Sequence, residues 1–185
     1  MWLVMRPSPA APRPGTAALA AAPAVAEPPP DVSRLPPAEG ATTLANWNYD
    51  RQNWAHAIEH YEQAIRLGAD NADIRTDLGN CFRFLAQPQK ALDQYQMAQR
   101  QNPQHENSLF NTAGLYGEEL RDPAKAAESW REYLRRFPTA AGAARARQSL
   151  SEAEQHATDQ AAMLKRLINE DSPKQPPTPH PAPAP

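Results

Sequence analysis

The chain has 185 residues, a formal net charge of −2, 21 prolines and a single cysteine. This length suggests at most one compact domain with tails, and the near-zero charge gives no indication of nucleic-acid binding. Cys81 cannot form an internal disulfide, so a disulfide framework is excluded and the redox compartment stays open.

Proline is concentrated at the two ends of the chain. Ten prolines fall in residues 1–37 and seven in residues 173–185. Because proline lacks a backbone N–H and disrupts a helix interior, both ends are expected to be extended. We therefore predict a disordered Ala/Pro-rich tether over 1–37, a folded body over 38–170 and a disordered Pro-rich tail over 171–185.

The start of the tether has three interpretations. The apolar run Met1–Met5 is too short to span a bilayer, but it is compatible with the stub of a longer membrane segment. The alanine-rich run Thr16–Ala26 has the outline of a secretory signal with an Ala-x-Ala cleavage site. A plain disordered linker is the third interpretation. A bacterial-type cell-envelope location, exported or membrane-tethered, and a cytoplasmic location therefore both stay open.

An internal repeat follows the tether. An alanine is followed four residues later by an aromatic residue, and this pair recurs after 34 and then 35 residues. Regular recurrence at such a period is typical of a protein built from stacked structural units. The three units are 38–71, 72–105 and 106–138. The repeated pairs are Ala57 and Tyr61, Ala91 and Tyr95, and Ala126 and Trp130.

The units resemble the tetratricopeptide repeat, whose pattern is W-x2-L-G-x2-Y, then A-x3-F, then P. The second unit shows it best, with Leu78-Gly79-x2-Phe82, Ala91-x3-Tyr95 and Pro103. The resemblance covers residues 38–138. It implies an all-α, tetratricopeptide-type solenoid of three helical hairpins. It also implies a non-catalytic adaptor that binds a peptide or helix of another protein, without a cofactor.

The same pattern predicts the helices in chain order. Gly79 and Gly114 are expected where two helices cross closely, since glycine removes a side chain from the contact. An apolar stripe from Ala146 to Ile168 predicts one long helix over 140–169. This helix, in a segment over 139–170, would cap the last repeat. The six helices of the repeats are predicted at 39–51, 54–67, 72–85, 88–101, 106–120 and 123–136.

The resemblance places binding in a concave groove lined by the first helix of each repeat. Asn46 and Asn80 recur there, and an asparagine amide can pair with both the N–H and the C=O of an extended peptide. The alternative is that both amides bond to an adjacent helix. The family's clamp for a terminal carboxylate is not expected, because Thr42 and Asp77 replace two of its residues. The candidate groove residues are Thr42, Asn46, Tyr49, Thr76, Asn80, Arg83, Phe84 and Asn111.

One motif suggests a different function. His56-Ala57-Ile58-Glu59-His60 matches H-x-x-E-H, the pattern of inverzincin zinc proteases. Such a site needs both histidines on zinc, the glutamate as general base and a third ligand elsewhere. Because Ala57 and Ile58 belong to the repeat core, His56 and His60 are expected to face solvent. A metal-dependent hydrolase is the alternative function, and solvated histidines or a weak surface metal site are favoured over it.

The end of the long helix is a second candidate interaction surface. The stripe is mainly alanine up to Ala161 and then becomes bulky. If the helix extends past the repeats, this end would dock onto a partner helix, a membrane surface or a second copy of the chain. The competing prediction is a bend near His156 that folds the end back onto the last repeat. The residues concerned are Met163, Leu164, Leu167 and Ile168.

Overall fold

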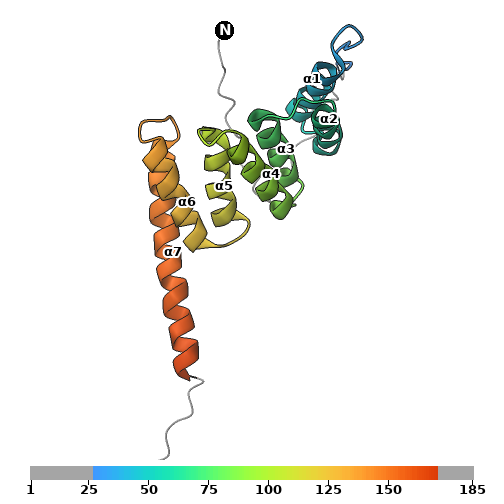
Figure 1. The fold of residues 1–185 in the computed structure, drawn as a ribbon. Helices are drawn as coiled ribbons and strands as arrows, with labels where there is room; N and C mark the ends of the chain where they lie inside the picture. The colour runs from blue at the N-terminus through green and yellow to red at the C-terminus, as the bar shows by residue number, and fades with distance from the viewer. Residues whose placement is uncertain (1–26, 171–185) are drawn as a thin grey trace, which may run out of the picture.

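A computed structural model describes residues 27–170 of the chain (Figure 1). Within this range the chain forms seven α-helices and no β-strand, as the repeat pattern predicts. Each helix begins and ends within two residues of its predicted bounds, except that the last begins three residues later. The predictions for 1–26 and 171–185 concern residues outside the described range. The helices are α1 (Pro37–Asp50), α2 (Trp54–Arg66), α3 (Ala72–Phe84), α4 (Pro88–Gln101), α5 (Glu106–Glu118), α6 (Pro123–Arg136) and α7 (Ala143–Glu170).

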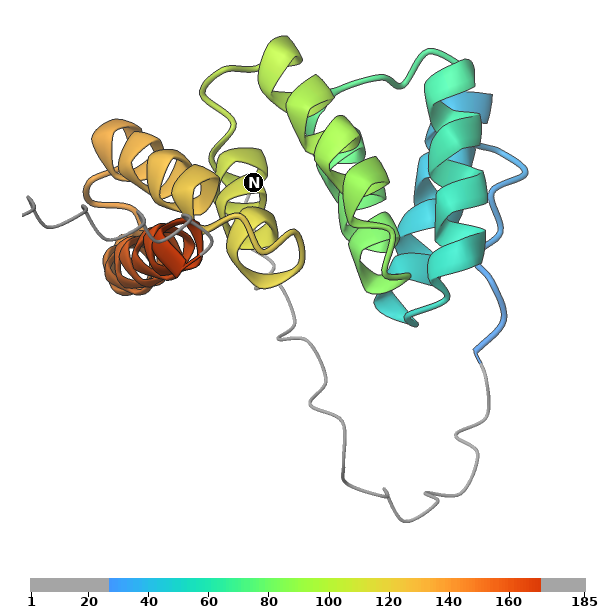
Figure 2. The same cartoon turned by 90° about the horizontal axis from the view of Figure 1, so that it is seen from below.

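The helices pack as consecutive hairpins. α1 packs against α2, α3 against α4 and α5 against α6, and α7 packs against α6. Loops of three to six residues join them, which keeps neighbouring helices antiparallel. Figure 2 shows the pairs following one another in a row. Proline stands at the first turn of α4 and α6, where a helix needs no amide donor.

The turn inside each hairpin uses the same backbone conformation. Gln52, Ala86 and Arg121 have φ angles of 60°, 55° and 52°, and they occupy equivalent positions in the three repeats. Each lies just after the first helix, where a left-handed residue lets following amides bond back to the last turn. The amide of Asn53, for example, donates to the carbonyl of Asn48 at 2.9 Å. Gln87 donates to Phe82 in the same way at 2.9 Å, whereas in the third turn Asp122 donates to Tyr116, one residue further back, at 2.8 Å.

The repeated alanine–aromatic pairs form the centre of the core, as predicted. Tyr61 and Tyr95 have no exposed surface, and Trp130 is nearly buried. One cluster fills the space between α1, α2, α3 and α4 and reaches Leu115 of α5. A second cluster joins α5, α6 and α7. Each small alanine lets the neighbouring helix approach, and the aromatic ring one turn later fills the remaining space.

The two glycines predicted at close crossings differ. A Cβ on Gly79 would lie 2.5 Å from a ring carbon of Tyr95 and 3.2 Å from the carbonyl of Ala91, so the close crossing is confirmed there. A Cβ on Gly114 would make only ordinary contacts, the nearest being 3.7 Å from the guanidinium of Arg83. The prediction for Gly114 is therefore wrong, because the side chain facing it is long and polar rather than a buried ring.

Residues 27–36 also differ from the prediction, which assigned them to the disordered tether. A carboxylate oxygen of Glu27 lies 2.7 Å from the guanidinium of Arg51 at the end of α1. The side chain of Val32 lies against Gly40 in the first turn of α1. The segment therefore contacts both the first turn and the end of α1. These two contacts hold residues of the segment assigned to the tether against α1.

Candidate interaction surface

The first helices of the hairpins, α1, α3 and α5, are joined by side-chain hydrogen bonds; we call them the first-helix layer. Asn80 of α3 lies at its centre. Its Nδ2 donates to the hydroxyl of Tyr49 on α1 at 3.2 Å, and its Oδ1 accepts from Nδ2 of Asn111 on α5 at 2.9 Å. Three of the predicted groove residues are thus brought together.

Tyrosines of the second helices complete this network. The hydroxyl of Tyr61 donates to Oδ1 of Asn46 at 2.7 Å, and the hydroxyl of Tyr95 donates to Oδ1 of Asn80 at 2.8 Å. The amide oxygens therefore bond to an adjacent helix, which was the alternative arrangement. Asn80 is only 8% exposed and Asn46 is half-buried. The equivalent pair in the third repeat is apolar and consists of Leu115 and Trp130.

Arg83 forms a second connection between α3 and the end of α5. Its Nε donates to Glu119 and its Nη2 donates to Glu118, both at 2.6 Å. The Glu118 carboxylate also lies 3.7 Å from the guanidinium of Arg145 on α7. Burial raises the pKa of the Glu119 carboxyl, and its second oxygen is buried without a hydrogen-bond partner. Arg83 is therefore engaged within the fold by two carboxylates.

The remaining predicted groove residues have local roles. The hydroxyls of Thr42 and Thr76 donate to backbone carbonyls four residues earlier, at 2.9 Å and 2.7 Å. Phe84 stacks on Trp54 of α2, with ring centroids 4.2 Å apart. The sequence reasoning missed Tyr61 and Tyr95 as partners of the asparagines. The sequence feature that could have revealed these pairs is the spacing of fifteen residues from Asn46 to Tyr61, which recurs from Asn80 to Tyr95.

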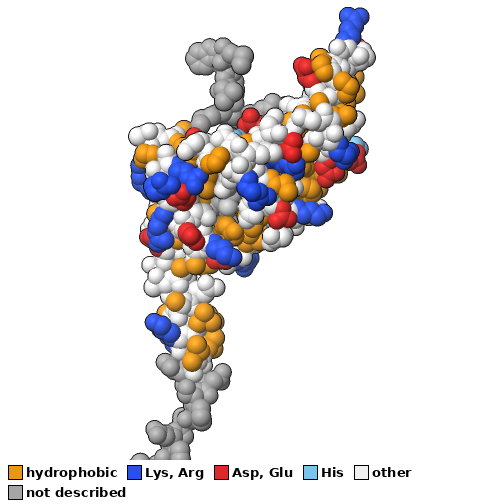
Figure 3. Space-filling model, viewed as in Figure 1, with side chains coloured by type: hydrophobic (Ala, Val, Ile, Leu, Met, Phe, Trp, Pro, Cys, Tyr) orange, Lys and Arg blue, Asp and Glu red, His pale blue; other side chains and the backbone are white. Residues whose placement is uncertain are grey.

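Charge is divided between the two layers of helices. The first-helix layer carries six carboxylates and two arginines, Arg75 and Arg83. Both arginines are ion-paired, Arg75 with Asp70 and Arg83 with two glutamates. The second helices α2, α4 and α6 carry five carboxylates and seven lysines or arginines. Figure 3 shows basic side chains gathered over α6 and the start of α7. The first-helix layer is therefore the acidic one.

The histidine motif lies on α2. His56 is exposed as predicted, but His60 is half-buried and its Nδ1 is buried without a hydrogen-bond partner, so the expectation for His60 is corrected. Among residues 27–170, no group of three His, Cys, Asp or Glu side chains is placed to hold a metal ion. Cys81 is fully buried, and burial raises the pKa of its thiol far above the usual value. Its thiol is therefore not activated as a nucleophile.

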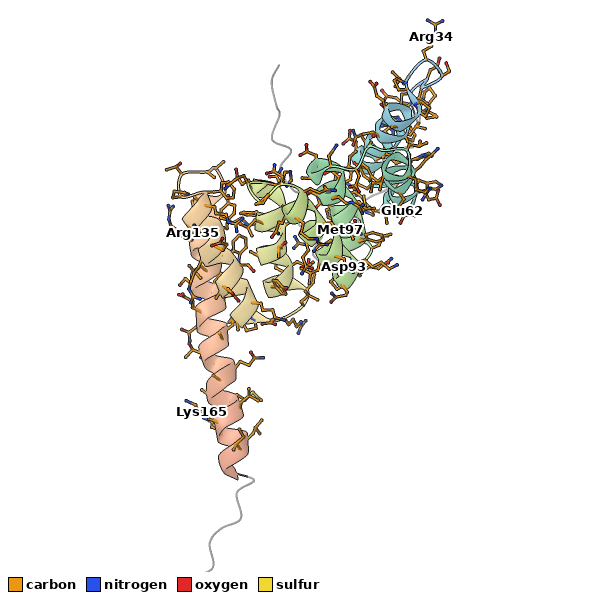
Figure 4. All side chains as sticks on the ribbon, in the orientation of Figure 1. Arg34, Glu62, Asp93, Met97, Arg135 and Lys165 are labelled. Carbon is orange, nitrogen blue, oxygen red and sulfur yellow. The ribbon has the colours of Figure 1, made fainter. Side chains whose placement is uncertain are left out.

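The second candidate surface lies at the end of α7. The helix runs unbroken from Ala143 to Glu170 and extends past the repeats (Figures 1 and 4), so the predicted bend near His156 is wrong. Figure 3 shows apolar side chains on one side of this end and basic side chains on the other. In the described part of the chain, no helix combines the length and the apolarity needed to cross a bilayer. The exposed apolar residues are Met163, Leu164, Leu167 and Ile168.

Comparison with known proteins agrees with this architecture. A family profile described as "TPR repeat" matches residues 46–82, whereas no curated protein matches the chain. The TPR domain of Arabidopsis OM64 superposes with a TM-score of 0.57 at 21% identity, covering 64% of this chain and 95% of that domain. The first TPR of Spaghetti (RPAP3), bound to the HSP90 peptide SRMEEVD, gives 0.58 at 15%, covering 66% and 96%. The MamA protein gives 0.60 at 21%, covering 77% and 79%.

Because these sequence identities are low, the solved structures establish the fold alone. The family profile matches the amino-acid sequence from the first repeat into the second. The internal repeat extends the same pattern to the third hairpin. The chain therefore has the fold of tetratricopeptide repeat domains, with three helical hairpins and a long seventh helix packed on the last of them, and its sequence matches the repeat profile over residues 46–82.

Proposed function

We propose that this chain is a non-catalytic adaptor that binds a positively charged peptide or helix of another protein along the first-helix layer. The observation that carries the proposal is the charge of that layer. Six carboxylates and two arginines give it a formal charge of −4, and Arg83 pairs with Glu118 of the layer whereas Arg75 pairs with Asp70 outside it. A cationic partner would gain attraction along its length, whereas an anionic one would meet repulsion.

Similar folds support binding in general, although their ligands differ in charge from the one proposed here. The RPAP3 domain binds the peptide SRMEEVD, which has three acidic residues and one arginine. In this chain the first helices have no unpaired lysine or arginine within residues 27–170 to receive such a peptide. Thr42 and Asp77 at two clamp positions argue in the same direction. The same fold is therefore proposed to select the opposite charge.

Asn46 is the best-placed polar contact for a peptide backbone. Its Oδ1 accepts from the Tyr61 hydroxyl, and the half-buried side chain keeps part of its surface open to a partner. Asn80 is buried and its amide bonds three other side chains, so we assign it a supporting role. Tyr49 and Asn111 support the layer in the same way.

The test is affinity capture with the full chain as bait, followed by identification of the retained protein and measurement of its dissociation constant. Asp50→Asn with Asp73→Asn removes two exposed charges from the first-helix layer. Glu59→Gln with Asp93→Asn removes two exposed charges from the second helices and serves as the control. We expect the first pair to weaken binding by roughly three- to tenfold, and the control pair to change it little. Equal effects of the two pairs would contradict the proposed location.

A further inference from the structure

The end of α7 carries large apolar side chains in water. Met163, Leu164, Leu167 and Ile168 are 63%, 54%, 48% and 67% exposed, and they follow one another on a helix with no break. Single exposed apolar residues are ordinary, but a cluster of this kind usually marks an interaction site. Figure 4 shows Lys165 on this end, well below the repeats.

The side chains along the apolar stripe of α7 change from small to large. Where α6 covers the stripe, the small Ala146 and Ala153 are buried in the cluster that contains the large Trp130 and Tyr133. The cluster between α7 and α6, an antiparallel neighbour, thus combines small and large side chains, and the large Leu150 of α7 packs against the same cluster, which also holds the small Ala126 and Ala127 of α6. This combination fills the space between two helices at a constant separation.

Beyond α6 the apolar stripe of α7 continues with alanines that are less buried. Ala157 is half-buried and Ala161 is exposed. The large Leu164 and Ile168 then follow on the same face, at helical spacing. This end of α7 therefore presents both halves of the small-against-large combination, in sequence along one face.

We propose that this end pairs with the same segment of a second copy of the chain, in antiparallel orientation. In the register that fits, Leu164 of each copy lies opposite Ala161 of the other, and Ile168 lies opposite Ala157. Each large side chain then meets an alanine, as on α6. Parallel pairing would place large side chains against each other and alanine against alanine, which leaves voids beside overpacked positions.

The charged side chains of this end do not decide the orientation. Its described part carries one carboxylate, Asp159, and two cations, Lys165 and Arg166. Asp159 and Arg166 lie about half a turn round α7 from Leu164 and Ile168, so they face solvent in both pairings. The fit of large side chains against alanines therefore sets the antiparallel orientation.

The overlap of the two ends is short, which sets the strength of the association. It involves about three helical turns from each copy. The surface area that these turns can bury is smaller than the roughly 800 Å² per partner that stable complexes bury. The dimer is therefore concentration-dependent. The unbound end stays soluble because its other face carries Lys165, Arg166 and polar residues.

Sedimentation equilibrium of the full chain over a range of concentrations tests the association. We expect the average mass to rise from 20.4 kDa towards twice that value. Leu164→Glu should hold the chain monomeric, whereas the control Ala162→Glu, on the opposite side of α7, should leave dimerisation unchanged. A wild-type chain that stays monomeric overturns the proposal, and so does a loss of dimer that is equal in both variants. A monomer that binds phosphatidylserine vesicles would make this end a membrane-docking segment instead.

Disulfide trapping tests the orientation. Ala161→Cys and Leu164→Cys chains are prepared separately, mixed and oxidised, with wild type as the control because its Cys81 is buried. Antiparallel pairing predicts that disulfides between the two different variants exceed those within each variant. A predominance of disulfides between identical variants would show parallel pairing and contradict the proposal.

Discussion

Asn80 bonds side chains of three other helices. Its amide contacts Tyr49 on α1, Tyr95 on α4 and Asn111 on α5, and it is almost completely buried. Buried polar groups of this kind stabilise a fold only while all their partners are satisfied. Asn80 therefore acts first as a structural residue, and any effect on partner binding would follow from its effect on the layer.

Replacing Asn80 tests this role. Asn80→Ala would leave the Tyr95 hydroxyl and the Asn111 amide buried without their acceptor, so we expect a loss of roughly 2–4 kcal/mol in the free energy of unfolding. Asn46→Ala should cost less, because only the Tyr61 hydroxyl loses its acceptor and the site is half-buried. Urea unfolding followed by circular dichroism measures both. An Asn80→Ala variant as stable as wild type would show that the network contributes little.

The two interior glycines provide a matched pair. Gly79→Ala places a methyl group against the buried Tyr95 ring, and we expect it to destabilise the fold by roughly 1–3 kcal/mol. Gly114→Ala meets no such contact, and alanine favours a helix by up to about 1 kcal/mol over glycine, so this variant should be neutral or stabilising. Thermal unfolding of both variants measures the change in stability that each substitution causes. Similar destabilisation in the two would contradict the assignment of Gly79 alone to the close crossing.

The residue pattern predicted the core better than the polar network. Ala57 and Tyr61 fall where their spacing requires, because helical periodicity fixes which side chains face the neighbouring helix. The bonds of Asn80 depend on how α1, α3 and α5 stack, and a single hairpin pattern contains no information on that stacking. For the same reason, Gly114 looked equivalent to Gly79 although a different side chain faces it.

At the scale of elements, each of the three hairpin turns contains one residue whose backbone conformation is strained. Gln52, Ala86 and Arg121 adopt the left-handed conformation that glycine adopts freely and other residues disfavour. The spacing of 34 and 35 residues between them was visible in the sequence, but the absence of glycine concealed the conformation. The turns persist because the helices on both sides are fixed by the core.

This cost can be measured by substitution. Ala86→Gly relieves the left-handed strain, and we expect it to raise the free energy of unfolding by up to about 1 kcal/mol despite the greater freedom of glycine in the unfolded chain. Arg121→Gly should act in the same direction and add to it, since the two turns are in different repeats. Chemical denaturation of the single and double variants gives the values. Destabilisation by Ala86→Gly would show that its side chain makes a contribution larger than the backbone strain.

At the scale of the whole molecule, the hairpins align helices of different charge in two layers. The acidic first helices are joined by Asn80 and Arg83, and the second helices carry seven of the nine lysines and arginines of the six hairpin helices. The sequence allowed the fold to be predicted, because the fold follows from the repeat. The cationic partner proposed here could not be inferred from the repeat pattern, since that proposal depends on which carboxylates share a layer.

The most direct test of the proposed adaptor role is a hydrogen–deuterium exchange footprint of the full chain with and without its captured partner. We expect partner binding to slow exchange in α1, α3 and α5, and a higher salt concentration to reduce this protection because the contact is electrostatic. Protection confined to α2, α4 and α6, or protection of α1, α3 and α5 that is independent of salt, would contradict it.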